Sequence, residues 1–214
     1  MCGHGVTIAQ HSTRDESGKF SVFKTIVADL RSNADPSRRT GIDYWSRVLG
    51  KAIFAPTVHV VILYRISSTL YQWRITRPIS FILRSMSVVW GSTEIHPSVR
   101  IGPGFCLIHS VKVIIAAHVT IGEDVRISHG VSIGGDAGRG SRDTEIVAPV
   151  IGDHVTIGMD AIIMGPVSVG DHSVIGAQSL VIHDIPAYSV AAGSPARVLR
   201  RLDSAPEEPS GPKS

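Results

Sequence analysis

An aliphatic residue returns at every sixth position from about residue 95 to residue 187. The positions are Ile95, Ile101, Leu107, Val113, Ile121, Ile127, Ile133, Ile151, Ile157, Ile163, Val169, Ile175 and Val181. Glycine often follows the aliphatic residue, so each unit combines a short strand with a corner that glycine can turn. A period of six fits neither a 3.6-residue helix nor strand alternation. It predicts a parallel β-helix whose aliphatic side chains stack inside from coil to coil.

Two breaks interrupt this period. The unit that starts at Val113 is two residues too long, and a polar, glycine-rich insertion separates Ile133 from Ile151. We expect the insertion to leave the coil as a loop over residues 135–149. The β-helix itself is expected to span residues 93–190.

The chain before the repeats has helical periodicity. Residues 23–31 predict a short amphipathic helix, and residues 44–89 predict two or three packed helices. We therefore expect an N-terminal helical domain over residues 20–92. After the repeats, the sequence S-P-A-R-V-L-R-R-L predicts a short helix in a C-terminal cap over residues 191–202. Residues 1–19 and 203–214 are expected to be disordered, because they contain few apolar residues.

Composition excludes several classes of protein. The net charge is only +3 and the basic residues are dispersed, which argues against a nucleic-acid partner. Two cysteines far apart in sequence, Cys2 and Cys106, favour a reducing and therefore cytoplasmic compartment. Residues 52–64 are apolar but too short to cross a bilayer, which needs about 20 apolar residues. Peripheral contact with a membrane remains open.

Two histidines occupy the same place in units that lie one coil apart. His109 is the third residue of the unit at Leu107, and His129 is the third residue of the unit at Ile127. They should stack in adjacent coils about 4.8 Å apart. A neutral imidazole suits general-base catalysis near physiological pH. A metal centre would need a third histidine in this stack, so no metal is expected.

The repeat form I-G-x-x-V-x, ending in V-A-A-G-S-P-A-R-V, resembles the left-handed parallel β-helix acetyltransferases. The order E-I-H-P at 94–97, L-I-H-S at 107–110 and V-S-I-G-G at 131–135 resembles serine O-acetyltransferases, and also exopolysaccharide acetyltransferases of the colanic acid type. The resemblance implies an enzyme that uses acetyl-CoA. It implies that His109 is the base that deprotonates the acceptor, and that Glu94 orients this histidine. His129 is a possible second histidine of the site.

Other residues are candidates for the cofactor side. Gly134 and Gly135 have no side chains, so their N–H groups can approach a thioester carbonyl and stabilise an oxyanion. The resemblance implies that Ala161, Ala177 and Ala192 contact CoA, although Met159 is bulkier than the alanine usual there. Arg197 and the arginines that follow it are either a solvated chain end or counterions for the cofactor phosphates.

The acceptor side departs from the serine enzymes. An aspartate that would meet the amino group of serine is replaced by Ile108, and an arginine–histidine pair that grips its carboxylate is replaced by Val147 and Ala148. Asp35 still matches an amino-acid-binding position of the family. A site without these charges loses strong charge-assisted hydrogen bonds to a zwitterion.

The loop at residues 135–149 is also longer than in serine enzymes, and its Arg139 and Arg142 could reach a carbohydrate. We therefore expect an O-acetyltransferase that acts on a sugar or glycan precursor. Serine O-acetylation for cysteine synthesis is the first alternative, and a non-catalytic hexapeptide-repeat scaffold is the second. The resemblance also implies a trimer or a dimer of trimers.

Overall fold

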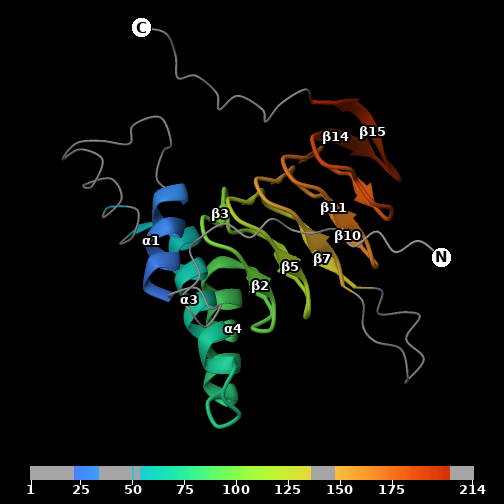
Figure 1. Cartoon of the computed structure of the whole chain (residues 1–214). Helices are drawn as coiled ribbons and strands as arrows, with labels where there is room; N and C mark the ends of the chain where they lie inside the picture. Colours follow the sequence, from blue (N-terminus) through green and yellow to red (C-terminus); the bar gives the residue numbers. More distant parts are fainter. Residues whose placement is uncertain (1–21, 34–49, 51–53, 136–147, 203–214) are drawn as a thin grey trace, which may run out of the picture.

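The computed structural model describes residues 22–33, 50, 54–135 and 148–202 (Figure 1). Three helices within these ranges precede the strands: α1 (Val22–Asn33), α3 (Pro56–Tyr71) and α4 (Arg77–Gly91). The prediction of a helix at residues 23–31 is confirmed. No described helix is long and apolar enough to cross a membrane.

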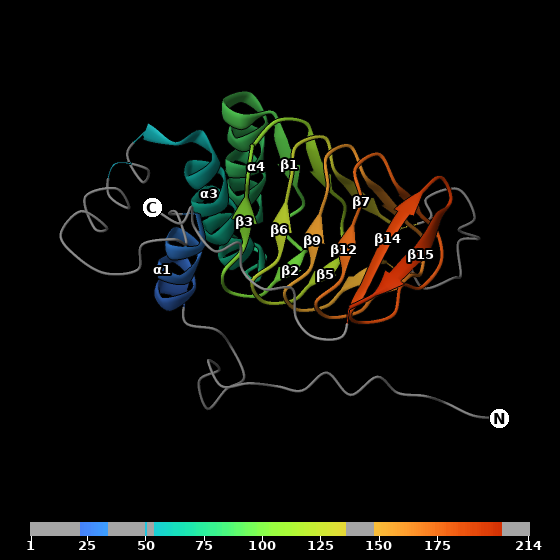
Figure 2. The ribbon, with the colours of Figure 1, turned by 90° about the horizontal axis from the view of Figure 1, so that it is seen from above.

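The strands wind into coils whose three sides are three sheets. The first sheet contains β1 (Thr93–Ile95), β4 (Val113–Ile115), β7 (Ser132–Gly134), β10 (Ile162–Met164) and β13 (Leu180–Val181). The second contains β2 (Arg100–Ile101), β5 (Thr120–Ile121), β8 (Val150–Ile151) and β11 (Ser168–Val169). The third contains β3 (Cys106–Leu107), β6 (Arg126–Ile127), β9 (Thr156–Ile157), β12 (Val174–Ile175), β14 (Ser189–Gly193) and β15 (Ala196–Arg201), of which Figure 2 shows the ladder face-on.

The register between coils follows the aliphatic repeat. Leu107 pairs with Ile127, and Ile127 pairs with Ile157, all parallel and all buried. Neighbouring strands keep this register although β5 and β8 are separated by the insertion. The insertion therefore falls between β7 and β8, and the coil continues in register after it. The predicted parallel β-helix is confirmed.

A second inward position per unit completes the core. It follows the aliphatic residue by four positions in most units and holds valine in several of them, as at Val125, Val131 and Val155, each fully buried. The two inward positions fill the interior with branched aliphatic side chains in every coil. The column of coils therefore has one continuous hydrophobic core.

The helices cover the first coil rather than forming a separate core. Helix α4 packs on β1, while α1 and α3 pack on β3. Val60, Val61 and Tyr64 of α3 belong to the same buried cluster as the coil residues. The Tyr64 hydroxyl donates to the Val99 carbonyl at 2.8 Å, and burial raises the pKa of Tyr64 to about 12. This hydroxyl is therefore a hydrogen-bond donor at any physiological pH.

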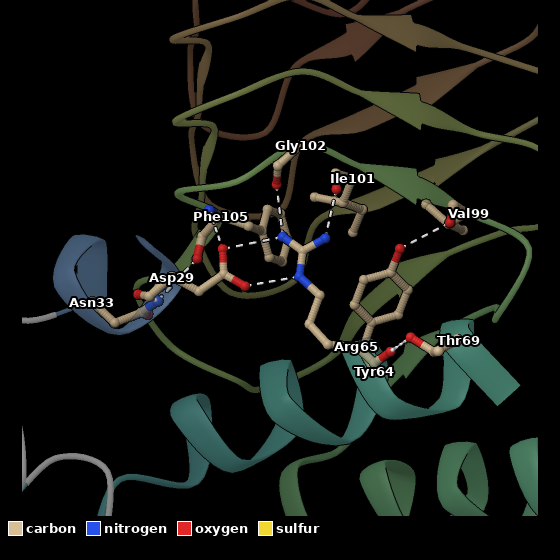
Figure 3. Close-up of polar contacts among 9 residues, drawn as sticks. All are labelled: Asp29, Asn33, Tyr64, Arg65, Thr69, Val99, Ile101, Gly102 and Phe105. Carbon is tan, nitrogen blue, oxygen red and sulfur yellow. Dashed lines mark hydrogen bonds and ion pairs between the residues drawn. The ribbon is translucent and has the colours of Figure 1, made fainter. Parts of the chain in front are cut away.

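A buried ion pair fastens α1 and α3 to the first coil (Figure 3). Arg65 Nε lies 2.8 Å from Asp29 Oδ2, and its Nη atoms donate to the Ile101 and Gly102 carbonyls at 2.5 and 2.6 Å. The Phe105 N–H donates to Asp29 Oδ1 at 2.9 Å. Burial raises the pKa of the Asp29 carboxyl, and its bonds to Arg65 and the backbone act in the opposite direction.

Aromatic rings form a ladder at the corner between the second and third sheets. The rings of His154 and His172 are stacked with centroids 4.6 Å apart, and the Tyr188 ring follows at 4.8 Å. All three residues have positive φ, near 55°, which makes this corner turn sharply. Burial, followed by repulsion from His154, lowers the pKa of His172.

The C-terminal prediction is wrong in one respect. Residues 196–201 form strand β15, antiparallel to β14, and not a short helix. Gly193 has φ of +106°, and the chain reverses there and returns along β14. The returning strand satisfies backbone groups that the last coil would otherwise leave unpaired at the end of the third sheet.

Candidate active site

The candidate site begins at the corner between the third and first sheets. His109 follows β3 and His129 follows β6, and their ring centroids are 5.8 Å apart at an interplanar angle of 60°. His109 is exposed and His129 is half-buried. The predicted stacking in adjacent coils is confirmed. The pair presents an accessible imidazole to any molecule that lies along this corner.

The same column continues into the later coils. Backbone hydrogen bonds from Ser128 to Ile157 and from Gly158 to Ile175 place Met159 next to His129, and Ala177 next to Met159. Met159 and Ala177 are exposed. Two candidates lie at the far end: Ala192, and the exposed Arg197 that pairs with it across β14 and β15. One exposed edge thus runs from the histidines to Arg197.

Glycine at this edge has a structural reason. A Cβ on Gly158 would lie 2.6 Å from the Ala177 nitrogen, and one on Gly176 would lie 2.7 Å from the Ala192 Cβ. Neither position has room for a Cβ atom, so the coils could not stack at their present spacing if Gly158 or Gly176 carried a side chain. The absence of side chains also leaves the edge shallow beside Met159 and Ala177.

The expected contact at Ala161 is wrong. Ala161 is fully buried in the core and occupies the second inward position of its unit, which Val155 occupies in the unit before. Its methyl group therefore points away from the surface. The six-residue period contains this information, because the residue four positions after the leading aliphatic faces inward in most units.

The two candidate oxyanion donors, Gly134 and Gly135, do not lie beside the histidine pair. Gly134 ends β7 and Gly135 follows it, whereas His129 lies before β7 begins. A three-residue strand is roughly 10 Å long at about 3.3 Å per residue. The histidines and the glycines therefore occupy opposite edges of the first sheet. One copy of the chain does not bring them together.

Glu94 lies on the outer face of β1, where its carboxylate pairs with Arg84 of α4. No hydrogen bond joins Glu94 to His109, although the structure describes both residues. Sequence reasoning missed Arg84, because it lies on a helix outside the repeats and no motif marks it. The role of Glu94 in orienting His109 stays a prediction.

The acceptor candidates are only partly described. Asp35, Arg139, Arg142 and Val147 lie outside the described residues. Ile108 is 46% exposed next to His109, and Ala148 is half-buried against the core. An apolar side chain, not a carboxylate, therefore borders the base. Within the described ranges, no group of three histidine, cysteine or acidic side chains could hold a metal ion.

Comparison with known proteins identifies the family. Residues 148–183 match the family described as bacterial transferase hexapeptide (six repeats). A serine acetyltransferase of Helicobacter pylori strain 26695 is 35% identical over 150 residues, which cover 68% of this chain and 82% of that protein. The chain belongs to the serine acetyltransferase family.

Solved structures of the family agree with this fold. The serine acetyltransferase of Brucella abortus in complex with coenzyme A has a TM-score of 0.74 and 28% identity, covering 84% of this chain and 68% of that one. The soybean enzyme complexed with serine has a TM-score of 0.73 and 29% identity, covering 84% and 70%. The chain is therefore an acyltransferase, as predicted.

Proposed function

We propose that this acyltransferase moves the acetyl group of acetyl-CoA to the hydroxyl of L-serine. The observation that carries the proposal is the exposed His109–His129 pair at one end of a shallow edge, in a chain of the serine acetyltransferase family. The relatives named above support serine as acceptor and CoA as the acyl carrier. None of them supports the sugar that the sequence analysis favoured.

The chemistry needs one base and a polarised carbonyl. His109 removes the proton from the acceptor hydroxyl while its oxygen attacks the thioester carbonyl, giving a tetrahedral oxyanion. The carbon–sulfur bond then breaks, and the CoA thiolate takes the proton back from the imidazolium. His129, in ring contact with His109, limits where the His109 ring can turn.

The edge that begins at the histidines suits the cofactor. Its thioester end would lie beside His109, with the pantetheine chain passing Met159 and Ala177. The phosphates would reach Arg197, which is exposed and carries the positive charge that they require. Two of the three predicted alanine contacts, Ala177 and Ala192, lie on this path.

A second copy of the chain would complete the site. Gly134 and Gly135 lie across the first sheet from His109, so their N–H groups can serve the oxyanion only at the histidines of a neighbouring copy. This arrangement supports the predicted trimer, in which each site forms between two β-helices. Sedimentation equilibrium tests it, and a stable monomer with full activity would contradict it.

A second acceptor class is favoured by one observation. Ile108 places an exposed apolar side chain beside the base, where the serine enzymes carry the aspartate that meets the amino group. A hydroxyl compound without a charged amine, such as a sugar, needs no such partner. This acceptor stays the second candidate.

The deciding experiment measures CoA release from acetyl-CoA with serine and with a panel of sugars. We expect release with serine, and its loss in His109→Ala. Turnover with a sugar but not with serine would replace the first candidate by the second. If no acceptor releases CoA and His109→Ala changes nothing, the chain is a non-catalytic scaffold.

Ile108→Asp refines the test. A carboxylate there would meet the ammonium group of serine, and charge-assisted hydrogen bonds are roughly twice as strong as neutral ones. We expect a higher kcat/KM for serine and no gain for sugars. Ile162→Asp is the matched control, because Ile162 is 39% exposed on β10 and lies away from the histidine column.

A further inference from the structure

Helix α4 buries small side chains and exposes large apolar ones, the reverse of the usual arrangement. Its buried residues are Ser80, Ser87 and Gly91, and the Ser80 hydroxyl lies 3.0 Å from the hydroxyl of Ser67 on α3. A surface helix of a globular protein normally turns its large apolar residues toward the core. Here small residues form the contact with α3, and the large apolar residues face outward.

The outward residues form one continuous stripe. Ile75, in the turn before α4, precedes four residues of the helix that recur at intervals of three and four and therefore share one face: Ile79, Ile82, Met86 and Val89. Their exposed fractions are 92%, 50%, 61%, 51% and 88%. Exposed tryptophans mark both ends of the stripe, Trp73 and Trp90. At about 1.5 Å per residue, the part of the stripe on α4, from Ile79 to Val89, is roughly 15 Å long.

The charge of this region is one-sided. The sequence contains no aspartate or glutamate between Asp43 and Glu94, whereas arginines recur throughout that interval. Arg74 and Arg77 are exposed at the turn between α3 and α4, next to Trp73 and Ile75. No carboxylate of the described residues forms an ion pair with either arginine. The turn therefore combines cations with large apolar groups.

We propose that α4 and the turn before it lie flat on an anionic phospholipid bilayer. A bilayer accommodates both features, because the apolar stripe can insert at the boundary between headgroups and acyl chains while the arginines contact the lipid phosphates. Tryptophan at both ends suits the headgroup level, where one side of the ring is apolar and the other is wet. A second copy of the chain fits less well, since it would bring the same unpaired arginines together without an acidic partner.

The position of the hairpin agrees with such attachment. The turn between α3 and α4 projects from the end of the molecule that carries the first coil, while β14 and β15 lie at the other end (Figure 1). Glu94, the acid that ends the cationic interval, is already paired with Arg84. Binding through α4 would hold the histidine pair of the first two coils close to the membrane surface.

The test is co-sedimentation of the full chain with vesicles of phosphatidylcholine, alone or mixed with phosphatidylglycerol. We expect the chain to bind the mixed vesicles. This binding should weaken as the salt concentration approaches about 1 M, because the Debye length is then only about 3 Å. Each of Arg74→Gln and Arg77→Gln should weaken binding roughly five-fold, which is about 1 kcal/mol per cation. Ile82→Ser with Val89→Ser should weaken it more than about ten-fold, because two large apolar groups are lost.

Val198→Ser with Leu199→Ser is the matched control, since these residues are 40% and 67% exposed on β15, at the other end of the molecule from the stripe. It should bind as the unmodified chain does. Circular dichroism melting checks that each variant is folded. Absence of binding to mixed vesicles overturns the proposal, as does equal loss in the control. If Ile82→Ser with Val89→Ser instead dissociates an oligomer and no vesicles are bound, a second copy covers the stripe.

Discussion

Replacing Asp29 by alanine should destabilise the whole fold, because this residue joins three separate parts of it. The carboxylate accepts two hydrogen bonds from Arg65, at 2.8 and 3.1 Å, and one from the Phe105 backbone. Asp29 and Arg65 are only 2% and 8% exposed. Removing the carboxylate leaves a buried guanidinium that faces two carbonyl groups and no anion.

Breaking a buried ion pair at one partner costs about 3–5 kcal/mol. The orphaned Phe105 N–H acts in the same direction, but the two losses are not independent, so we expect about 4 kcal/mol in total. For a chain of this size, each kcal/mol lowers the melting temperature by about 2–4 °C. Asp29→Ala should therefore melt roughly 8–16 °C below the unmodified protein.

The assay is thermal unfolding followed by circular dichroism at one fixed protein concentration. The double variant Asp29→Leu with Arg65→Met should recover much of the loss, because it removes both charges together. Glu94→Gln is the control: its ion pair with Arg84 is partly exposed, and such pairs are worth at most about 1 kcal/mol. If Asp29→Ala and Glu94→Gln melt at the same temperature, the buried pair does not fasten the helices to the coil.

The remaining predictions concern the site and its response to pH. His109→Ala should lower turnover by about a hundred- to ten-thousand-fold with little change in CoA affinity, and Glu94→Gln should lower it less; single-turnover kinetics and calorimetry measure both. Since burial lowers the pKa of His172, the unfolded chain binds its proton at higher pH than the folded chain does, near 6.5. The free energy of unfolding should therefore fall as the pH drops through about 6.5. In His172→Gln, the melting temperature should depend less on pH in this range. An unchanged slope in His172→Gln would contradict the assigned cause.

The sequence predicted the coil and its register because one physical rule repeats in it. An aliphatic residue at every sixth position fixes which side chains face inward, so the twenty-residue interval from Leu107 to Ile127 was enough to bring His109 and His129 together. The same rule, applied to the second inward position, would have placed Ala161 in the core.

Other features depend on contacts that no local pattern encodes. The C-terminal segment has the composition of a helix end, but its backbone pairs with β14, an edge that exists only once the coils are stacked. Arg84 reaches Glu94 because α4 packs on β1. The separation of Gly134 from the histidines follows from which corner of the coil each one occupies.

The number of stacked coils sets the length of a molecule that can span the histidine edge from the base to Arg197. From β3 through β6, β9, β12 and β14 to β15, which carries Arg197, there are five steps of about 4.8 Å, so the base and Arg197 are set roughly 24 Å apart. Removing one complete coil would shorten that interval by one step without disturbing the register of the coils that remain. Differences in coil number between two such proteins would thus select molecules of different length, while changes confined to the corners would alter only what those molecules meet on the way.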